Sequence, residues 1–404
     1  MVLPTTTRRI LTHPTWTGPR KTPNAPVTSW PRRMTRPLRS LKRHPTRCIP
    51  LKRRLRGGYD TRAQLASYVG ATMATQYHSH FFTVLIAGKR VRFLRWERAS
   101  AIVTKSFDLT HEPLLLFEFF KRFRQLTLEQ RGSNTHVSPA TATEASDARK
   151  LLQNMAPELW LGAAGYLFLK TNTIDIRTQP FLKLTFEGRT FIIPAPHCPE
   201  RGLSPFGRAS RGTAAVCVDQ DTKKRTVCFL KDGWRDTHRI SEPEVYKALA
   251  ENQIRNIANM ACGGDLKAST IGHIYRAEKA WVRRGDVNKV RQLQSCIIVL
   301  DVVGRPLVAF RKAHQLVGAL ADAMEAYSDA LKKAGIMHRD ISPYNILIVN
   351  TNTEQKGILI DWDHAIRINP ASTKRCLWRT GTWQFMSIAL LKKLEGRTYS
   401  AGRP

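Results

Sequence analysis

The sequence lacks an apolar run long enough to cross a membrane. A spanning helix needs about 18 or more apolar residues, and even the apolar stretch from Cys296 to Val303 is interrupted by Asp301. The first residues also lack the apolar core of a secretory signal peptide. These absences predict an intracellular chain, in the cytoplasm or the nucleus, without a membrane span.

The cysteines lack the paired C-x-x-C spacing that zinc sites and redox motifs use. There are seven of them, an odd number, and they are scattered along the chain. This pattern predicts reduced thiols of an intracellular protein, because a disulfide framework needs cysteines that can pair.

The N-terminal segment lacks acidic residues, since the first carboxylate is Asp60, whereas residues 1–56 hold 15 Lys or Arg and nine prolines. Such a segment buries too little apolar surface to fold, so a disordered basic tail is predicted over residues 1–59. The run from Lys52 to Arg56 fits a patch for nuclear import or nucleic acid, although a simply solvated tail is slightly favoured. Weak contact with nucleic acid or acidic surfaces is therefore expected.

The rest of the chain is globular in composition. The sequence has 404 residues, 42% of them hydrophobic, which is enough for two or more domains with a substantial core. Periodicity predicts a strand meander over 76–106, helices over 112–126 and 142–155, and a hairpin turning at Glu187-Gly188. Thr143 or Ser146 is the predicted cap of the second helix.

One stretch, from Ile336 to Ala365, carries the clearest chemistry. A His-Arg-Asp tripeptide ending at Asp340 is followed by Asn345 and then, after two apolar runs, by Asp361. This is the kinase-type order H-R-D-x-x-x-x-N followed by a D-F-G-like triplet. Phosphoryl transfer needs one carboxylate to orient the acceptor hydroxyl, and an amide and a second carboxylate to hold Mg²⁺ on the ATP phosphates. A chance tripeptide in a turn is the alternative, but four elements in order argue against it.

Local patterns predict how this stretch folds. Apolar strands at 346–349 and 358–360 flank turn residues, so a β-hairpin would bring Asn345 and Asp361 to the same end. A buried helix that stops at Gly335 is predicted upstream. The apolar residues that predict it by their helical spacing are Leu316, Leu320, Met324, Tyr327 and Leu331.

Upstream of this stretch, two strands at 211–218 and 225–231 would suit the roof of a nucleotide site. The glycines available for a phosphate loop are Gly207 and Gly212, whose spacing is not the usual G-x-G-x-x-G, so an ordinary turn is an equal alternative. A buried strand over 296–307 would supply the adenine-binding hinge, and residues 263–291 carry no interpretable pattern.

Lys231 ends the second of these strands, where kinases place the lysine that contacts the α- and β-phosphates. An edge-strand lysine is the alternative. Glu242, which begins an apolar helical face, is its predicted partner. A competing prediction takes Ser241 and Glu244 as a capping box, which would put Glu242 at the helix start and leave it in solvent.

The motifs HRDIS, NILI and GILIDWDHA, followed by GTWQFMS, resemble the fungal-type protein kinase family. The distinctive features are Ser342, where most protein kinases have Lys, and the triplet DWD in place of DFG. The resemblance extends roughly from Ala63 to Leu391 and implies a two-lobed protein-kinase-like fold of α+β class. The expected segments are a tail at 1–59, a family-specific α+β region at 60–200, the kinase-like domain at 204–391 and a C-terminal tail at 392–404.

The activity implied by this resemblance is transfer of the ATP γ-phosphoryl group to Ser or Thr hydroxyls of proteins, with Mg²⁺. The catalytic residues would be Asp340, which orients the hydroxyl, with Asn345 and Lys231. The nucleotide-binding residues would be Lys231, Glu242, Gly212, Asn345 and Asp361. The metal ligands would be Asn345 and Asp361.

Departures from the kinase pattern keep other functions open. Ser342 removes a cation from the transferring phosphate, which would suit a small-molecule phosphotransferase. No A-P-E follows GTWQFMS, and only 13 residues follow Leu391, so the larger lobe is expected to be incomplete. A catalytically weak or dead pseudokinase acting as a nucleotide-binding scaffold is a further alternative, as is nucleic-acid binding through the tail with the core as passenger.

Overall fold

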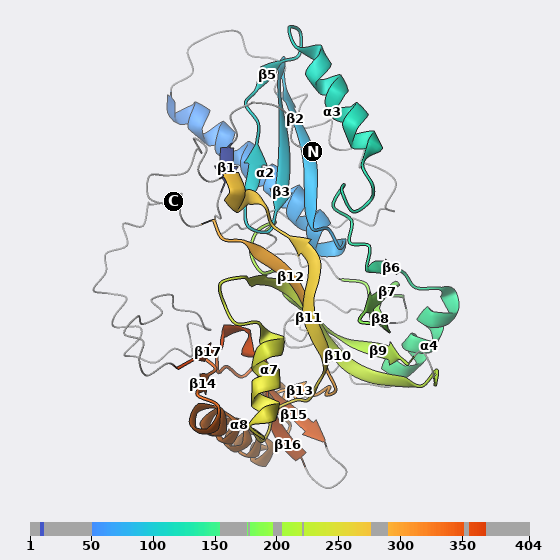
Figure 1. Ribbon diagram of the computed structural model, residues 1–404, viewed down its shortest axis with the longest axis vertical. Helices are drawn as coiled ribbons and strands as arrows, with labels where there is room; N and C mark the ends of the chain where they lie inside the picture. Colours follow the sequence, from blue (N-terminus) through green and yellow to red (C-terminus); the bar gives the residue numbers. More distant parts are fainter. Residues whose placement is uncertain are drawn as a thin grey trace, which may run out of the picture. The chain divides into compact units, whose positions relative to one another are not determined.

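The computed structural model describes residues 9–11, 51–153, 176, 178–196, 204–219, 222–275, 290–350 and 355–368. In this part of the chain five α-helices accompany several antiparallel sheets, which confirms the predicted α+β class (Figure 1). The chain divides into two compact units. Unit 1 comprises residues 1–138, 195–211 and 266–295, and unit 2 comprises residues 139–194, 212–265 and 296–404.

Unit 1 is built on an antiparallel sheet. Its strands are β1 (Arg9–Leu11), β2 (His80–Ala87), β3 (Arg90–Glu97), β4 (Ala101–Val103) and β5 (Phe107–Asp108). They pair in the order β1-β4-β3-β2, with β5 also on β3, so the predicted meander is present. The sheet is accompanied by α2 (Leu51–Thr75) and α3 (Pro113–Gln125).

Two features of unit 1 differ from expectation. Disorder is predicted through residue 59, yet β1 and the start of α2 fall in that segment. The helix predicted over 112–126 is present as α3, but its dense apolar residues leave none of its side chains buried. Its contact with the sheet is aromatic, because Phe119 stacks on Phe93 with ring centroids 4.2 Å apart.

Unit 2 contributes most of a larger sheet, in the strand order β11-β12-β10-β9-β8-β7-β6. The strands are β6 (Val137–Pro139), β7 (Phe181–Phe186), β8 (Arg189–Pro194), β9 (Arg211–Val218), β10 (Arg225–Asp236), β11 (Met260–Ser269) and β12 (Leu293–Leu300). The hairpin of β7 and β8 turns at Glu187-Gly188 as predicted, since both residues have positive φ. β10 continues past Lys231, and residues 263–269, which have no clear sequence pattern, belong to β11.

Helix α4 (Ala142–Gln153) begins where the sequence predicts, but the predicted cap is wrong. Thr141, not Thr143 or Ser146, makes the reciprocal bonds of a capping box. Its hydroxyl accepts the Glu144 N–H at 3.2 Å, and the Glu144 carboxylate accepts the Thr141 N–H at 2.9 Å.

The remaining elements of unit 2 surround the kinase-like motifs. The helices are α7 (Glu242–Glu251) and α8 (Ala313–Lys333), with short 3₁₀ turns η4 (Leu307–Ala309) and η5 (Trp362–His364). The strands are β13 (Arg305–Pro306), β14 (Ile336–Met337), β15 (Ile346–Asn350), β16 (Gln355–Leu359) and β17 (Ile366–Arg367). The predicted hairpin is β15 and β16, which pair from Ile346 with Leu359 to Asn350 with Gln355.

Helix α8 is present as predicted, but only part of its predicted apolar face packs on the core: Leu316 and Tyr327 are partly buried against it. Its buried apolar residues are Ala319, Ala323, Ala326 and Ala330. Leu320 and Met324 are 40% and 52% exposed. The alanines let the helix lie close to β16, where a Cβ on Gly357 would stand 2.5 Å from the Ala319 Cα. Small side chains at a close approach therefore decide which face is buried.

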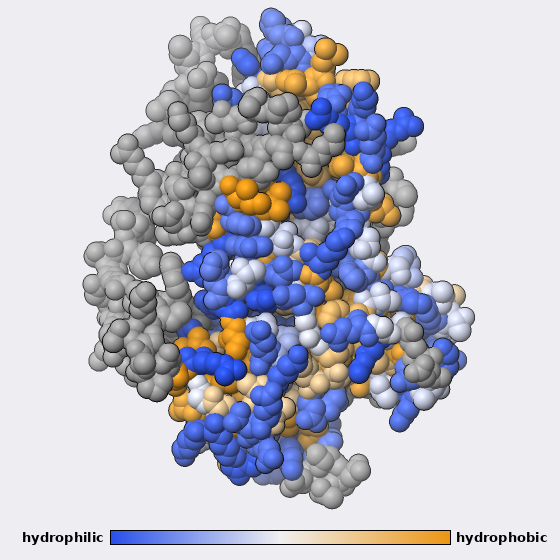
Figure 2. All heavy atoms as spheres, viewed as in Figure 1, coloured by the Kyte–Doolittle hydropathy of each residue, from blue (hydrophilic) through white to orange (hydrophobic). Residues whose placement is uncertain are grey.

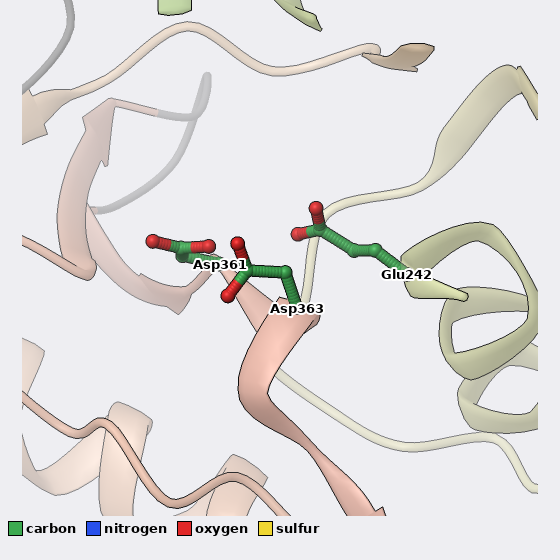
Figure 3. Close-up of side chains that lie close together, drawn as sticks. All are labelled: Glu242, Asp361 and Asp363. Carbon is green, nitrogen blue, oxygen red and sulfur yellow. The ribbon is translucent and has the colours of Figure 1, made fainter. Parts of the chain in front are cut away.

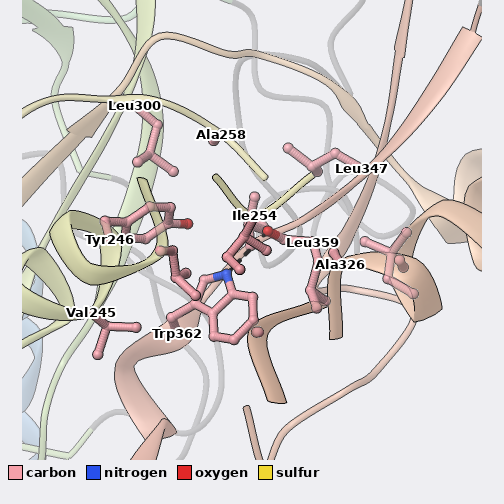
Figure 4. Close-up of a cluster of buried hydrophobic side chains, with 14 of the residues drawn as sticks. Val245, Tyr246, Ile254, Ala258, Leu300, Ala326, Leu347, Leu359 and Trp362 are labelled. Carbon is pink, nitrogen blue, oxygen red and sulfur yellow. Dashed lines mark hydrogen bonds between the residues drawn. The ribbon is translucent and has the colours of Figure 1, made fainter. Parts of the chain in front are cut away.

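The core of unit 2 joins these elements around Trp362 (Figure 4). The Trp362 side chain is fully buried, and its indole N–H donates to the Leu359 carbonyl at 3.2 Å. Tyr246 of α7 and Leu347 of β15 belong to the same cluster. Among the described residues, no helix is both long and apolar enough to cross a membrane.

Candidate active site

Lys231 and Glu242 form an ion pair, as the sequence predicts. The Lys231 Nζ lies 2.8 Å from a carboxylate oxygen of Glu242. The competing capping box of Ser241 and Glu244 is also present, yet Glu242 is not left in solvent: it is 9% exposed. Both predictions hold together because Glu242, the first residue of α7, contacts Lys231 from the capped end of the helix.

Asp361 joins this pair from the end of the hairpin. It adopts a left-handed conformation, with φ 66° and ψ 59°, between β16 and η5. Its carboxylate accepts a short hydrogen bond from Lys231. Asp363, two residues later, lies 3.4 Å from the same ammonium group. Figure 3 shows the carboxylates of Glu242, Asp361 and Asp363 turned toward one another.

The backbone ties Glu242 to the same triplet. Its second carboxylate oxygen accepts the Trp362 N–H at 3.0 Å. Glu242 therefore bonds the lysine with one oxygen and the Asp-Trp-Asp backbone with the other. This arrangement couples the start of α7 to the residue between the two aspartates.

Charge is unbalanced in this group, because one ammonium faces three carboxylates. Burial would lower the pKa of Lys231, but the charges of Asp361, Glu242 and Asp363 raise it well above its ordinary value. Burial raises the pKa of Glu242 to about 7, against the effect of Lys231 and with that of the two aspartates. Lys231 therefore stays charged, and the carboxylates compete for it.

The carboxylate group fits a divalent cation. One oxygen from each of Glu242, Asp361 and Asp363 lies within 4.8 Å of the others. Mg²⁺ prefers oxygen ligands and is bound in phosphoryl-transfer sites by one or two carboxylates together with substrate phosphates. The donor set is therefore compatible with Mg²⁺ and a nucleotide.

His338 fixes the loop that carries Asp340. Its Nε2 donates to the Ile360 carbonyl at 2.9 Å, so Nδ1 is the acceptor for the Asp340 N–H at 3.2 Å. The ring is fully buried beside Trp362, with centroids 4.5 Å apart. Burial lowers the pKa of His338, and the neutral ring is what these two bonds require.

Asn345 links the same loop to the hairpin. Its side-chain amide donates to the backbone carbonyl of Asp340 at 2.8 Å, and its backbone carbonyl accepts the Ile360 N–H at 2.9 Å. Ile360 precedes Asp361, so the hairpin brings Asn345 and Asp361 to one end, as predicted. The amide oxygen of Asn345 is the atom that could bind a metal.

Gly212, the predicted loop glycine, lies inside β9 and has no positive φ. A Cβ there would stand 2.5 Å from the Phe229 ring, so packing against β10 accounts for the glycine. Its contact with nucleotide remains a prediction. The GTWQFMS motif lies outside the described residues.

Two residues near the lysine were given no site role from the sequence. Tyr246, one turn after Glu242, is 1% exposed, and burial raises its pKa well above the ordinary value. Asp363 belongs to the DWD motif, which assigns it no contact of its own. The pattern that could have identified Asp363 is Asp-x-Asp directly after a strand, because it places two carboxylates close together in the sequence.

Comparison with known proteins relates part of the chain to a protein family. No curated protein matches the chain at a significant level. A sequence model of the fungal protein kinase family matches residues 266–400, about a third of the chain. The matched stretch contains the loop of Asp340, the hairpin and Asp361, but neither Lys231 nor Glu242. The resemblance to fungal-type protein kinases is thereby confirmed over residues 266–400, where the chain is similar to the fungal protein kinase family.

Proposed function

We propose that the chain is an ATP-dependent phosphotransferase that moves the γ-phosphoryl group to Ser or Thr hydroxyls of proteins. The observation that carries this proposal is the contact of Lys231 with both Glu242 and Asp361. The family match does not reach Lys231 or Glu242, so their meeting with Asp361 is independent support for a nucleotide site.

Each residue has a role in this proposal. Lys231, held by Glu242, would contact the nucleotide phosphates, and Asp361 with the amide oxygen of Asn345 would hold Mg²⁺. Mg²⁺ would neutralise charge on the phosphates when bound. Asp340 would orient the acceptor hydroxyl and take its proton, in a loop kept in shape by the neutral His338.

The same proposal includes a two-lobed kinase-like domain over residues 204–391. The β9 and β10 strands with α7 would form the nucleotide roof, and α8 with the β15 and β16 hairpin would form the catalytic side. The basic tail, the α+β region at 60–200 and the C-terminal tail would lie outside this domain.

A small-molecule phosphotransferase is the second candidate. Ser342 stands where most protein kinases have a lysine, and its side chain is buried, at 3% exposed. Because serine carries no charge, Ser342 supplies no cation to the transferring phosphate. Labelling of a small hydroxyl compound, without labelling of protein, would favour this candidate.

Transfer of γ-labelled phosphate from Mg-ATP to a panel of Ser- and Thr-containing proteins tests the first candidate. Asp340→Asn should lower turnover by about 10²- to 10⁴-fold, because the general base is lost. The dissociation constant of Mg-ATP, measured by calorimetry, should stay within about threefold of the wild-type value, because Asp340 makes no proposed contact with the phosphates. Nucleotide binding by the wild type without any transfer would instead support a pseudokinase, and equal turnover by both proteins would remove Asp340 from the catalytic role.

A further inference from the structure

Asp363 lies in the candidate active site but has no role in the proposed phosphoryl transfer. Its carboxylate lies 3.4 Å from the Lys231 ammonium, farther than that of Glu242 at 2.8 Å. Its side chain is 17% exposed, so its charge is only partly screened by water. Asp363 therefore acts on Lys231 mainly through charge.

The other two carboxylates each have a second role in the proposed site. Glu242 is bonded to Lys231 and to the Trp362 N–H, and Asp361 is the expected metal ligand. With Asp363 the group holds three carboxylates against one ammonium. A nucleotide triphosphate, itself strongly anionic, must approach this excess of negative charge to reach Lys231.

We propose that Asp363 makes nucleotide binding depend on a divalent cation, because its carboxylate competes with the phosphates for Lys231. This inference rests on the proposed function and adds a specificity-determining residue to it. Without the cation, Asp363 holds the ammonium and repels the phosphates. With the cation, the negative charge is neutralised, and Lys231 turns to the phosphates while Glu242 still holds it.

The geometry favours competition over a purely structural role for Asp363. All three carboxylates accept from one nitrogen, the Lys231 Nζ, and Figure 3 shows these carboxylates turned toward one another. An ammonium group has three donors, and each donor here already has a carboxylate partner. A phosphate oxygen can therefore bond Lys231 only by displacing one of them, and the contact at 3.4 Å is the longest of the three.

The test is the affinity of the full chain for ATP, measured by calorimetry once with Mg²⁺ and once with EDTA. Asp363→Asn keeps the shape of the side chain and removes its charge. It should tighten metal-free ATP binding by about tenfold or more, because one charge at a few ångströms has roughly this effect even at the dielectric constant of bulk water. Binding of Mg-ATP should change much less, so the ratio of the two affinities should fall.

Glu251→Gln is the matched control, because it removes one negative charge at an exposed position of α7, the helix that also carries Glu242. It should leave both affinities unchanged. An unchanged ratio in Asp363→Asn would overturn the inference. Weaker Mg-ATP binding with unaltered metal-free binding would also overturn it, because Asp363 would then be a metal ligand.

Two further outcomes separate the claims. If both affinities fall together and the unfolding temperature drops, Asp363 has a structural role and the inference is wrong. If the wild type binds no nucleotide even with Mg²⁺, the proposed function fails and the inference fails with it. Failure of the ratio test in a protein that binds Mg-ATP sinks the inference alone.

Discussion

Single residues of the site were predictable where a motif fixed their spacing. Asp340, Asn345 and Asp361 follow a short local pattern, and the hairpin that joins them is also local, so their meeting could be deduced. The pairing of Lys231 with Glu242 could only be proposed, because a capping box gave Glu242 an equally good local explanation. Asp363 was not predicted as a site residue, because the Asp-x-Asp pattern places two acids close together without showing that both face Lys231.

His338 provides a prediction about pH. Its pKa is lowered from the ordinary 6.5 by burial, so the folded protein favours the neutral ring. The resulting stability is fully present above the unfolded pKa and is lost as the pH falls through the folded pKa. We expect ¹H–¹⁵N NMR at pH 6 to show a neutral His338 protonated at Nε2.

His338→Asn identifies the signal, because the resonance that disappears belongs to His338. That variant should also lose less stability than the wild type between pH 7 and pH 5, measured by chemical denaturation. A doubly protonated ring at pH 6 would contradict the assignment of Nδ1 as acceptor for Asp340.

At the scale of elements, helices α3 and α4 and the turn at Glu187-Gly188 were well predicted, because they depend on neighbouring residues. The predicted strand ends were less accurate, since β10 continues to Asp236 and β12 ends at Leu300. The buried face of α8 was predicted only in part. Hydrophobicity ranks Leu320 and Met324 above alanine, whereas the structure buries Ala323 and Ala326. The deciding quantity is the distance between α8 and β16, which is a tertiary property that no local pattern contains.

Two glycines test this close approach. Gly357→Ala should destabilise the protein by about 1–3 kcal/mol, because its Cβ would collide with the Ala319 backbone. Gly318 lies on the exposed side of α8, with nothing within 4 Å of an added Cβ. Gly318→Ala should stabilise by about 0.5–1 kcal/mol through helix propensity.

Chemical denaturation with both variants measures these effects on one interface. Opposite signs are expected because the same methyl group meets backbone in one case and open space in the other. Equal effects of the two substitutions would mean that α8 does not rest on β16 through Gly357.

For the whole molecule, charge is the property that sequence alone predicts best. The formal charge is +34, and nine Lys or Arg stand between residues 12 and 50 without any acid. Charge acts through space on polyanions whatever the local fold, so it can be counted without knowing contacts. By contrast, which basic residues of the folded part also contact a polyanion depends on packing, and composition does not reveal packing.

The last prediction concerns this charge. The full chain should bind duplex DNA without sequence preference, and its affinity should fall steeply with salt because bound counterions are released. Replacing the nine basic residues between 12 and 50 by Gln should reduce the slope of log affinity against log salt by several units, up to roughly 0.9 per lost phosphate contact. Replacing the seven arginines among these nine residues by Lys keeps the charge and should keep the slope. Neither change touches β1, α2 or the lysine site, so Mg-ATP affinity should stay the same in both. An unchanged slope in the Gln variant would assign the DNA contact to basic residues elsewhere in the chain.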